Sequence, residues 1–229
     1  MKIYFIRHGH PDYANDRLTE LGHKQAEAAA ERLKDCGIEQ IYASTMGRAM
    51  ETAQHTANVL GLEVNGRDFI REISWGSLDG EPIPERGHPW NVSTLRALEG
   101  KSIFMKDWQE HYPYCNSKVV NSFREVSQGI DGWLLELGYK REGDYYRVVG
   151  EDTHKNVAMF SHAGASSAAL SHMLNIPLPQ FCGAFPIDFT SVTVLELSDE
   201  VGTLVYPDVL VLNDARHIEG ITVENFIGN

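Results

Sequence analysis

Four residues of the kinds that bind and transfer phosphate stand just after segments expected to be β-strands: Arg7, His8, Arg48 and His162. Arg7 and His8 follow an apolar run at residues 2–6, and His162 follows another at residues 156–161. Ligands of open α/β sheets bind outside the carboxyl ends of the strands. If the sheet places these ends side by side, two histidines and two arginines converge on one site.

This set of side chains suits a phosphoryl group. An imidazole can be phosphorylated and dephosphorylated near neutral pH, and a guanidinium binds phosphate oxygens through a planar fork of N–H donors. The backbone N–H groups after His162, beginning with Ala163, would add donors at a helix N-terminus. The residues therefore predict phosphoryl transfer, with an imidazole as the nucleophile and guanidinium groups as phosphate ligands.

Each of these residues also has an ordinary interpretation. An Arg-His-Gly segment is common at strand ends, a histidine after an apolar strand can be a hydrogen-bonded core residue, and an arginine early in a helix is usually solvated. His8 and His10 could bind a metal ion as a pair, but no carboxylate or third histidine stands at ligand spacing nearby. We therefore predict no metal site and no cofactor.

The elements that would carry these residues alternate along the chain. Strands are expected at residues 2–6, 40–43, 156–161 and 191–197. Helices are expected at residues 19–36, with Thr19 as N-cap and Gly37 as the stop, at residues 45–61 and at residues 163–174. Strands that alternate with helices predict an α/β fold, a three-layer αβα sandwich with a mostly parallel central sheet.

Residues 77–150 differ in character from the rest of the chain. Prolines and glycines punctuate the start of this segment, aromatic residues are dense in it, and apolar residues recur at alternating intervals of four and three from Val119 to Leu137. This periodicity predicts an amphipathic helix that Gly138 would end. We interpret residues 77–150 as a helical and aromatic lid inserted into a single domain that spans residues 1–229.

The charge balance limits the partners. The chain has 32 Asp and Glu against 20 Lys and Arg, which gives a formal net charge of −12. Nonspecific binding to nucleic acid and binding to anionic membranes both need a cationic face, so we expect neither. The expected partner is a small phosphorylated metabolite held by locally gathered arginines. An exposed edge strand or a face of the lid could support a homodimer.

The remaining signals concern the compartment. The apolar run at the N-terminus is far too short for the core of a signal peptide, and no stretch approaches the roughly 20 apolar residues of a membrane span. The cysteines at positions 36, 115 and 182 are an odd number and include no CxxC pair. This spacing argues against a disulfide framework and a thiolate zinc site. We expect a cytoplasmic protein.

Taken together, these segments resemble the histidine phosphatase superfamily, also called phosphoglycerate-mutase-like. The matching segments follow the family's order and span nearly the whole chain apart from residues 77–150: Ile6-Arg7-His8-Gly9, Leu18-Thr19-Glu20-Leu21-Gly22, Ala43-Ser44-Thr45-Met46-Gly47-Arg48-Ala49, Arg71-Glu72-Ile73-Ser74-Trp75-Gly76, Phe160-Ser161-His162-Ala163-Gly164 and Thr190-Ser191-Val192-Thr193-Val194. Because Ala163 replaces the aspartate of the phytase-like branch, the resemblance points to the branch of mutases and small phosphatases.

The resemblance implies a role for each matching residue. His8 would form a phosphohistidine, while Arg7, Arg48 and His162 would hold the phosphoryl oxygens and stabilise charge in the transition state. Glu72 would protonate the leaving oxygen and then act as a base.

The proton donor stays open at this point. An exposed glutamate paired with Arg71 is the ordinary interpretation of Glu72, and Asp79 and Glu81 are alternative donors nearby. Since His8 must be unprotonated while the donor starts protonated, we expect an acid-to-neutral pH optimum.

The segment after His8 departs from the family pattern. Many members continue Arg-His-Gly with Glu or Gln and then Thr or Ser, whereas this chain has His10-Pro11-Asp12. Family mutases place an asparagine seven positions after the motif arginine, where it touches the phosphate. Here that position is Ala14, and Asn15 beside it is the candidate phosphate ligand.

The resemblance first implies a phosphatase of small phosphate monoesters. A phosphoglycerate-mutase-type phosphotransferase is the alternative, which the residue at position 14 disfavours. A catalytically weak, phosphate-binding regulatory protein is a third, with the aromatic lid as its partner surface. The identity of the ester would be set in residues 77–150, which the resemblance does not cover.

Overall fold

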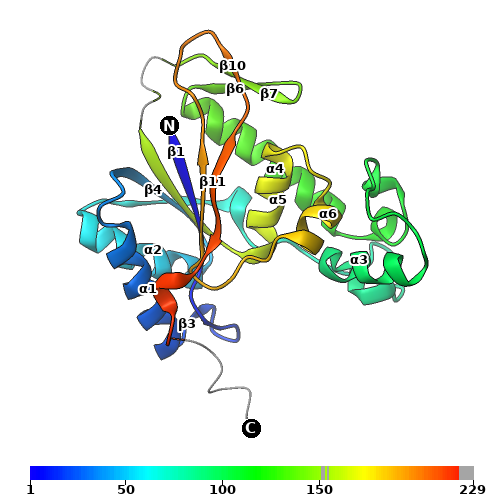
Figure 1. Cartoon of the computed structure of the whole chain (residues 1–229). Helices are drawn as coiled ribbons and strands as arrows, with labels where there is room; N and C mark the ends of the chain where they lie inside the picture. The colour runs from blue at the N-terminus through cyan, green and yellow to red at the C-terminus, as the bar shows by residue number, and fades with distance from the viewer. Residues whose placement is uncertain (151–152, 154, 222–229) are drawn as a thin grey trace.

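The computed structural model describes residues 1–150, 153 and 155–221 of the chain. A six-stranded sheet in the order β11-β9-β1-β8-β4-β5 forms its centre (Figure 1). Its strands are β1 (Lys2–Arg7), β4 (Ile38–Ser44), β5 (Val64–Arg67), β8 (Asn156–Ser161), β9 (Val192–Glu196) and β11 (Asp208–Asp214). β1, β8, β4 and β5 are parallel neighbours, while β9 pairs antiparallel with both β1 and β11. The predicted α/β fold with a mostly parallel sheet is confirmed.

Helices cover both faces of the sheet. In Figure 1, α1 (Glu20–Leu33) and α2 (Gly47–Leu60) lie on one side, and α4 (Val119–Glu136) and α5 (Ala163–Met173) lie on the other. The first helix begins where its sequence predicts, because the Thr19 side chain accepts a hydrogen bond from the Gly22 N–H at 3.1 Å and so satisfies a free donor of the first turn. Gly61 ends α2 in the left-handed conformation, with φ of 67°.

The register of the sheet aligns the ends of three strands. Arg7 at the end of β1 stands opposite Ser161 at the end of β8, and the His8 N–H donates to the Ser161 carbonyl at 2.9 Å. On the other side of β8, Ala43 of β4 stands opposite Phe160. The first residues beyond these three strands therefore emerge side by side at one edge of the sheet.

Residues 77–150 divide into two parts. The predicted amphipathic helix is α4, which packs against α5 in the layer over the sheet; the Trp133 ring contacts the Tyr42 ring of β4 with 5.3 Å between centroids. Beyond it, β6 (Tyr139–Glu142) and β7 (Tyr145–Val148) join β10 (Leu204–Val205) in a three-stranded sheet. In contrast, α3 (Pro89–Leu98) stands away from the central sheet and contacts α6 (Leu178–Ala184), as Figure 1 shows. Residues 77–150 therefore include a helix that packs in the layer over the sheet and a part, before α4, that stands away from it; the inserted lid stays a prediction.

The polar segment after His8 also forms regular structure. A short antiparallel pair, β2 (Pro11–Asp12) and β3 (Arg17–Leu18), forms the turn between β1 and α1. Among the described residues, no helix is long and apolar enough to span a membrane.

The strand that leads to His162, β8, is stabilised by the buried apolar side chains around Phe160. Phe160 in β8 is fully buried and packs with the side chains of β1, β4 and α2. We expect Phe160→Ala to lower the free energy of unfolding by about 3–5 kcal/mol, because it removes a large apolar side chain and leaves a cavity. Denaturant unfolding measures this. Leu98→Ala, at a position that is 81% exposed, is the control and should change stability by less than about 0.5 kcal/mol. Equal effects of the two substitutions would contradict the assignment of Phe160 to the core.

Candidate active site

His8 is buried at the end of β1, and its ring is held in one orientation. Its Nδ1 lies 2.7 Å from the Gly9 carbonyl oxygen, which can only accept a hydrogen bond, so the proton of the neutral ring is on Nδ1. The lone pair is then on Nε2, to which Arg48 Nε donates at 3.2 Å. Nε2 is therefore the atom of His8 that can attack an electrophile.

The peptide of Gly9 is itself fixed from several sides. Its N–H donates to Thr52 Oγ1 at 3.1 Å, and the next N–H, of His10, donates to Gln25 Oε1 at 2.7 Å. A Cβ at position 9 would lie 2.5 Å from the carbonyl oxygen of Gly22, so only glycine allows this close approach. These contacts set the direction of the Gly9 carbonyl, which accepts the hydrogen bond from His8 Nδ1.

The environment of His8 keeps the imidazole neutral. Burial lowers its pKa to about 3; the hydrogen bond to the Gly9 carbonyl opposes this effect, and the positive charges of Arg7 and Arg48 add to it. A ring with so low a pKa carries a free lone pair at neutral and mildly acidic pH, as a nucleophile requires.

His162 faces His8 across the site, with 5.1 Å between the ring centroids. Its Nε2 lies 2.8 Å from Ser44 Oγ, and that oxygen accepts a hydrogen bond from the Met46 N–H at 3.3 Å. The Ser44 hydroxyl can donate to Nε2, and in that tautomer the ring proton of His162 is on Nδ1.

His162 Nδ1 is buried and has no hydrogen-bond partner in the described part of the chain. Burial lowers the pKa of His162, and its neighbours His8 and Arg48 lower it further, so the ring is neutral. In the tautomer that accepts from the Ser44 hydroxyl, Nδ1 carries the N–H. A buried donor without a partner costs about 1–3 kcal/mol, which an oxygen of a ligand would recover.

The two arginines are held by different contacts. Arg48 is buried, and its Nη1 donates to Asp16 Oδ1 at 2.5 Å while its Nε reaches His8. Arg7 Nη1 donates to the Ile187 carbonyl at 2.7 Å, and its guanidinium lies 3.9 Å from the centroid of the Phe189 ring. Arg7 Nε is also buried without a partner among the described residues. Both guanidinium groups therefore have a fixed orientation before any ligand binds.

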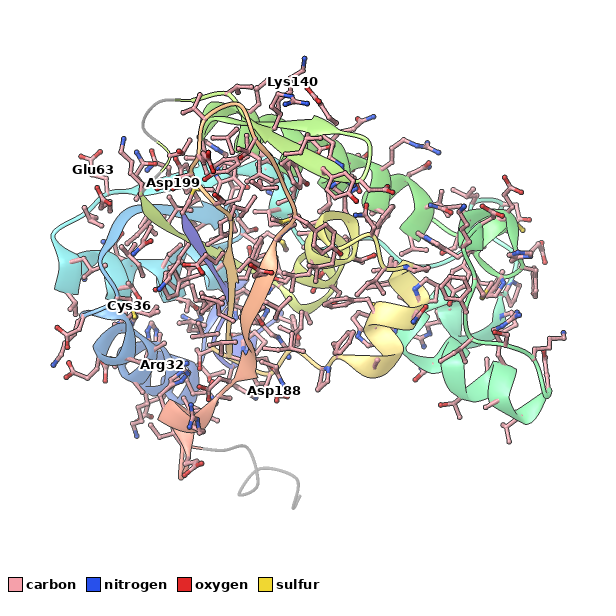
Figure 2. The ribbon with its side chains drawn as sticks, turned by 45° about the horizontal axis from the view of Figure 1, so that its top comes forward. Arg32, Cys36, Glu63, Lys140, Asp188 and Asp199 are labelled. Carbon is pink, nitrogen blue, oxygen red and sulfur yellow. The ribbon has the colours of Figure 1, made fainter. Side chains whose placement is uncertain are left out.

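A cavity of about 310 Å³ borders the site on the side of Arg7. Its lining includes Arg7, Asp188 and Phe189. Figure 2 shows Asp188 at the end of the sheet opposite to that of Asp199, and this is the end at which the catalytic candidates emerge.

Glu72 is partly buried against the start of α5. Its Oε1 accepts hydrogen bonds from the N–H groups of Ile73 and Ala165, both at 3.0 Å, and Oε2 is approached by the Gly164 N–H at 3.5 Å. Burial raises the pKa of Glu72, against the lowering effect of these amides and of Arg7. Because Oε1 is taken by two donors, a proton on this carboxyl resides on Oε2.

The alternative proton donors have less suitable surroundings. Asp79 is exposed, and hydrogen bonds from the Asn116 side chain and the Glu81 N–H lower its pKa, which favours the ionised form. Glu81 is exposed and lines a separate cavity beside Trp75. The pKa of Glu72 is raised by burial and the group feels the charge of Arg7, whereas the pKa of Asp79 is lowered.

The remaining predicted ligands are placed less favourably. Asn15 is exposed, and its amide donates to Asp12 Oδ2 at 2.8 Å, so its side chain serves the turn and is directed to a neighbour within it. Ala163 is the first residue of α5, next to His162. Its backbone N–H remains a predicted phosphate donor, although the following two amides are directed to Glu72.

Two residues near the arginines were not among the sequence candidates. Asp16 binds Arg48, and the Tyr13 ring lies 5.5 Å from the Arg48 guanidinium carbon. Tyr13 also raises the pKa of Arg7, as a charge and hydrogen-bond partner, against the dominant lowering by burial. Their position in a short polar turn after a catalytic motif is the one sequence feature that could have indicated them.

The donor set does not resemble a metal centre. The described residues include no group of three or more His, Cys, Asp or Glu side chains placed to hold a metal ion. The Nδ1 atoms of His8 and His10 are engaged by the Gly9 carbonyl and by Thr19 Oγ1, at 2.7 and 2.9 Å.

A family model and several curated proteins match the sequence. The model of the histidine phosphatase superfamily (branch 1) matches residues 3–208. Proteins named probable phosphoglycerate mutase GpmB, from Yersinia pestis and Yersinia pseudotuberculosis, are 30% identical over 116 residues, which is 45% of this chain. The match spans 54% of their length, so the chain corresponds to about half of these curated relatives.

Solved structures share the fold over nearly the whole chain. A mycobacterial glucosyl-3-phosphoglycerate phosphatase in complex with inorganic phosphate is 20% identical with a TM-score of 0.62, and the alignment covers 95% of this chain and 99% of that one. A phosphoserine phosphatase from Entamoeba histolytica, in complex with 3-phosphoglyceric acid, is 22% identical with a TM-score of 0.61 and the same coverage.

The contacts of His8 predict its tautomer and its titration. In ¹⁵N-resolved NMR of the ligand-free protein, His8 should carry its proton on Nδ1 and stay neutral from pH 7 down to about pH 4, since burial lowers its pKa to about 3. His8→Asn, which lacks the ring, assigns the signal. A His8 resonance that titrates near the ordinary value of about 6.5, or that reports a proton on Nε2, would contradict this account.

Proposed function

The chain belongs to the histidine phosphatase superfamily, branch 1, and on this premise we propose that it is a phosphatase that hydrolyses small phosphate monoesters through a phosphohistidine at His8. The observation that carries the proposal is the hydrogen bond from His8 Nδ1 to the Gly9 carbonyl, which leaves a lone pair on Nε2. The proposal assigns catalytic roles to His8, Glu72 and His162.

In the first step, His8 Nε2 attacks the phosphorus of the ester. The P–N bond forms as the bond to the leaving oxygen breaks, and Glu72 Oε2 donates its proton to that oxygen, so the product alcohol leaves neutral. Arg7, Arg48 and the Nδ1–H of His162 hold the phosphoryl oxygens, on which charge gathers in the transition state. The Arg48 Nε–H exchanges its acceptor from His8 Nε2 to a phosphoryl oxygen as the phosphorus reaches Nε2, while Asp16 still holds the guanidinium.

In the second step, a water molecule attacks the phosphorus on the side vacated by the alcohol. Glu72, now ionised, takes a proton from this water, and the P–N bond breaks to return the lone pair to His8 Nε2. Inorganic phosphate is released and Glu72 is again protonated. The raised pKa of Glu72 supports both roles, because a carboxyl with a pKa closer to the working pH gives and takes protons more readily.

The proposed substrates are small phosphorylated metabolites. Two proteins with this fold are named as phosphatases of glucosyl-3-phosphoglycerate and of phosphoserine, both small anionic esters. The part of residues 77–150 before α4 stands off the sheet, where a lid that selects the ester would lie. We further propose a cytoplasmic protein, since Cys36, Cys115 and Cys182 are all free thiols, and a homodimer.

A mutase is the second candidate, and the curated relatives favour it because they are named probable phosphoglycerate mutases. A mutase returns the phosphoryl group to a bound product instead of to water. The position at which family mutases place a phosphate-binding asparagine is Ala14 here, and the neighbouring Asn15 amide is directed to Asp12. The phosphatase therefore remains the preferred proposal.

Trapping the intermediate tests the proposed nucleophile. Rapid acid-free quenching of the protein mixed with ³²P-labelled phosphate esters should give a label that is stable to base and lost in acid, as expected of a phosphohistidine. His8→Ala should give no label. Stoichiometric release of free phosphate favours the phosphatase, and transfer of the label to a second hydroxyl favours the mutase. Unchanged labelling of His8→Ala would overturn both.

The pH profile tests Glu72. Because His8 stays neutral down to about pH 4 and Glu72 must start protonated, kcat/KM should fall as pH rises through the raised pKa of Glu72. Glu72→Gln should remove this fall and lower kcat for an alkyl phosphate by about 10²–10⁴-fold. The loss in kcat/KM, which reports the first step, should be much smaller for p-nitrophenyl phosphate, whose leaving oxygen needs no proton; the loss in kcat remains where the water step limits turnover.

Glu81→Gln is the matched control for this experiment, since Glu81 is the exposed alternative donor. A larger loss in Glu81→Gln than in Glu72→Gln would assign the acid to Glu81. An activity that rises steadily past pH 9 in the unsubstituted enzyme would contradict a carboxylic acid as the donor.

A further inference from the structure

The turn between β1 and α1 carries a carboxylate that reaches into the phosphoryl site. Asp16 Oδ1 accepts a hydrogen bond from Arg48 Nη1 at 2.5 Å, and Asp16 Oδ2 accepts one from the Gly47 N–H at 2.8 Å. The same guanidinium donates from Nε to His8 Nε2 at 3.2 Å. One planar group therefore joins the Asp16 carboxylate to the atom that attacks phosphorus.

We propose that Asp16 is a positioning residue, which fixes the rotation of the Arg48 guanidinium so that its Nε edge faces the phosphoryl group on His8. This inference rests on the proposed function, since it concerns the same site. Arg48 is not oriented by its own stem, because an arginine side chain has several rotatable bonds. Besides His8 and Asp16, the described residues give its guanidinium a long contact, 3.7 Å from Nη2 to Met46 Sδ, and the Tyr13 ring at 5.5 Å.

The chain is shaped to bring Asp16 to this point. Asp16 has φ of 49°, in the left-handed region that residues other than glycine rarely adopt. A Cβ at position 47 would lie 2.0 Å from the Asp16 carbonyl oxygen, so this approach also requires Gly47. A conformation that costs about 1–3 kcal/mol persists where the surrounding structure determines it, and such positions are frequent at functional sites.

The ends of the turn are anchored as well. The Leu18 N–H donates to Glu51 Oε2 at 2.7 Å, and the Thr19 N–H donates to the His10 carbonyl at 3.0 Å. Asp16 is therefore held from both directions along the chain, and its carboxylate is directed to Arg48 by the fold and not by chance contact at the surface.

The charge of the Asp16 carboxylate keeps it paired with Arg48. Burial of Asp16 opposes ionisation, but the hydrogen bonds from Gly47 and Arg48 outweigh it and lower the pKa of the carboxyl. The Arg48 side chain is 5% exposed, and the Asp16 side chain is 40% exposed. The Asp16 carboxylate therefore stays ionised at neutral and mildly acidic pH and holds the guanidinium, and the Arg48 Nε–H can exchange His8 Nε2 for an incoming oxygen without rotation of the group.

Fixing a guanidinium before the reaction matters most in the transition state. Charge spreads over the equatorial phosphoryl oxygens there, and donors that are already aimed at them need no reorganisation. Asp16 should therefore contribute more to the binding of a transition-state analogue than to the binding of the substrate in its ground state.

The test is a double-mutant cycle between Asp16 and Arg48. Asp16→Asn should lower kcat/KM roughly 10- to 100-fold, mainly through kcat, the size expected when a catalytic group is misplaced by about an ångström. Vanadate, as the transition-state analogue, should lose affinity by a larger factor than KM rises. In the Arg48→Ala background, Asp16→Asn should have no further effect beyond about twofold.

Two further variants keep the test decisive. Asp16→Gly also removes the carboxylate, and glycine adopts the left-handed conformation of position 16 without strain. Its kcat/KM should fall by the same factor as that of Asp16→Asn, so the test stands even if Asp16→Asn folds poorly. Asp12→Asn is the matched control: this half-buried aspartate of the same turn binds Asn15 and Arg17, does not contact Arg48, and should leave the kinetics unchanged. Circular dichroism verifies the fold of each variant.

The outcomes separate the inference from the function on which it rests. Equal losses from Asp16→Asn with and without Arg48, or tighter binding of inorganic phosphate by Asp16→Asn, would overturn positioning; the second result would identify Asp16 as a competitor of phosphate for Arg48. Full activity of Arg48→Ala and His8→Ala would instead overturn the proposed function.

Discussion

The hydrogen bond from His8 Nδ1 to the carbonyl of the next residue is the contact on which the site depends. A neutral imidazole has one N–H and one lone pair, so engaging Nδ1 as a donor decides that Nε2 faces the reactant. This works only if the Gly9 carbonyl points back at the ring, which Thr52, Gln25 and the close approach to Gly22 enforce. The nucleophile is therefore oriented by backbone packing, without a carboxylate partner.

The second constraint is electrostatic. The protein carries a formal charge of −12, yet the site that should accept a phosphate gathers Arg7, Arg48 and two buried histidines. Keeping both imidazoles neutral limits the positive charge to the arginines, and burial does this by lowering both pKa values. The same burial raises the pKa of Glu72, so one low-dielectric pocket moves a base and an acid in the directions that suit their proposed roles.

Much of this arrangement follows from local sequence patterns. The strands before His8 and His162 are apolar runs whose carboxyl ends must meet in a parallel sheet, so their convergence could be predicted. Contacts between residues far apart in the sequence could not be predicted in this way. Asp16 reaches Arg48, 32 positions along the chain, because the backbone adopts a left-handed conformation at Asp16. Asn15 stays a predicted phosphate ligand, and its amide donates to Asp12 within the turn. The edge strand β11 also went unpredicted: its apolar residues do not alternate, and its pairing with β9 shifts register twice.

The most direct test of the central claim is a crystal structure of the protein with vanadate. The account predicts vanadium bonded to His8 Nε2 in trigonal-bipyramidal geometry. Arg7, Arg48 Nε and His162 Nδ1 should contact the equatorial oxygens, and the apical oxygen should face Glu72. Vanadate bound to another side chain, with Arg48 Nε still donating to His8 Nε2, would contradict it.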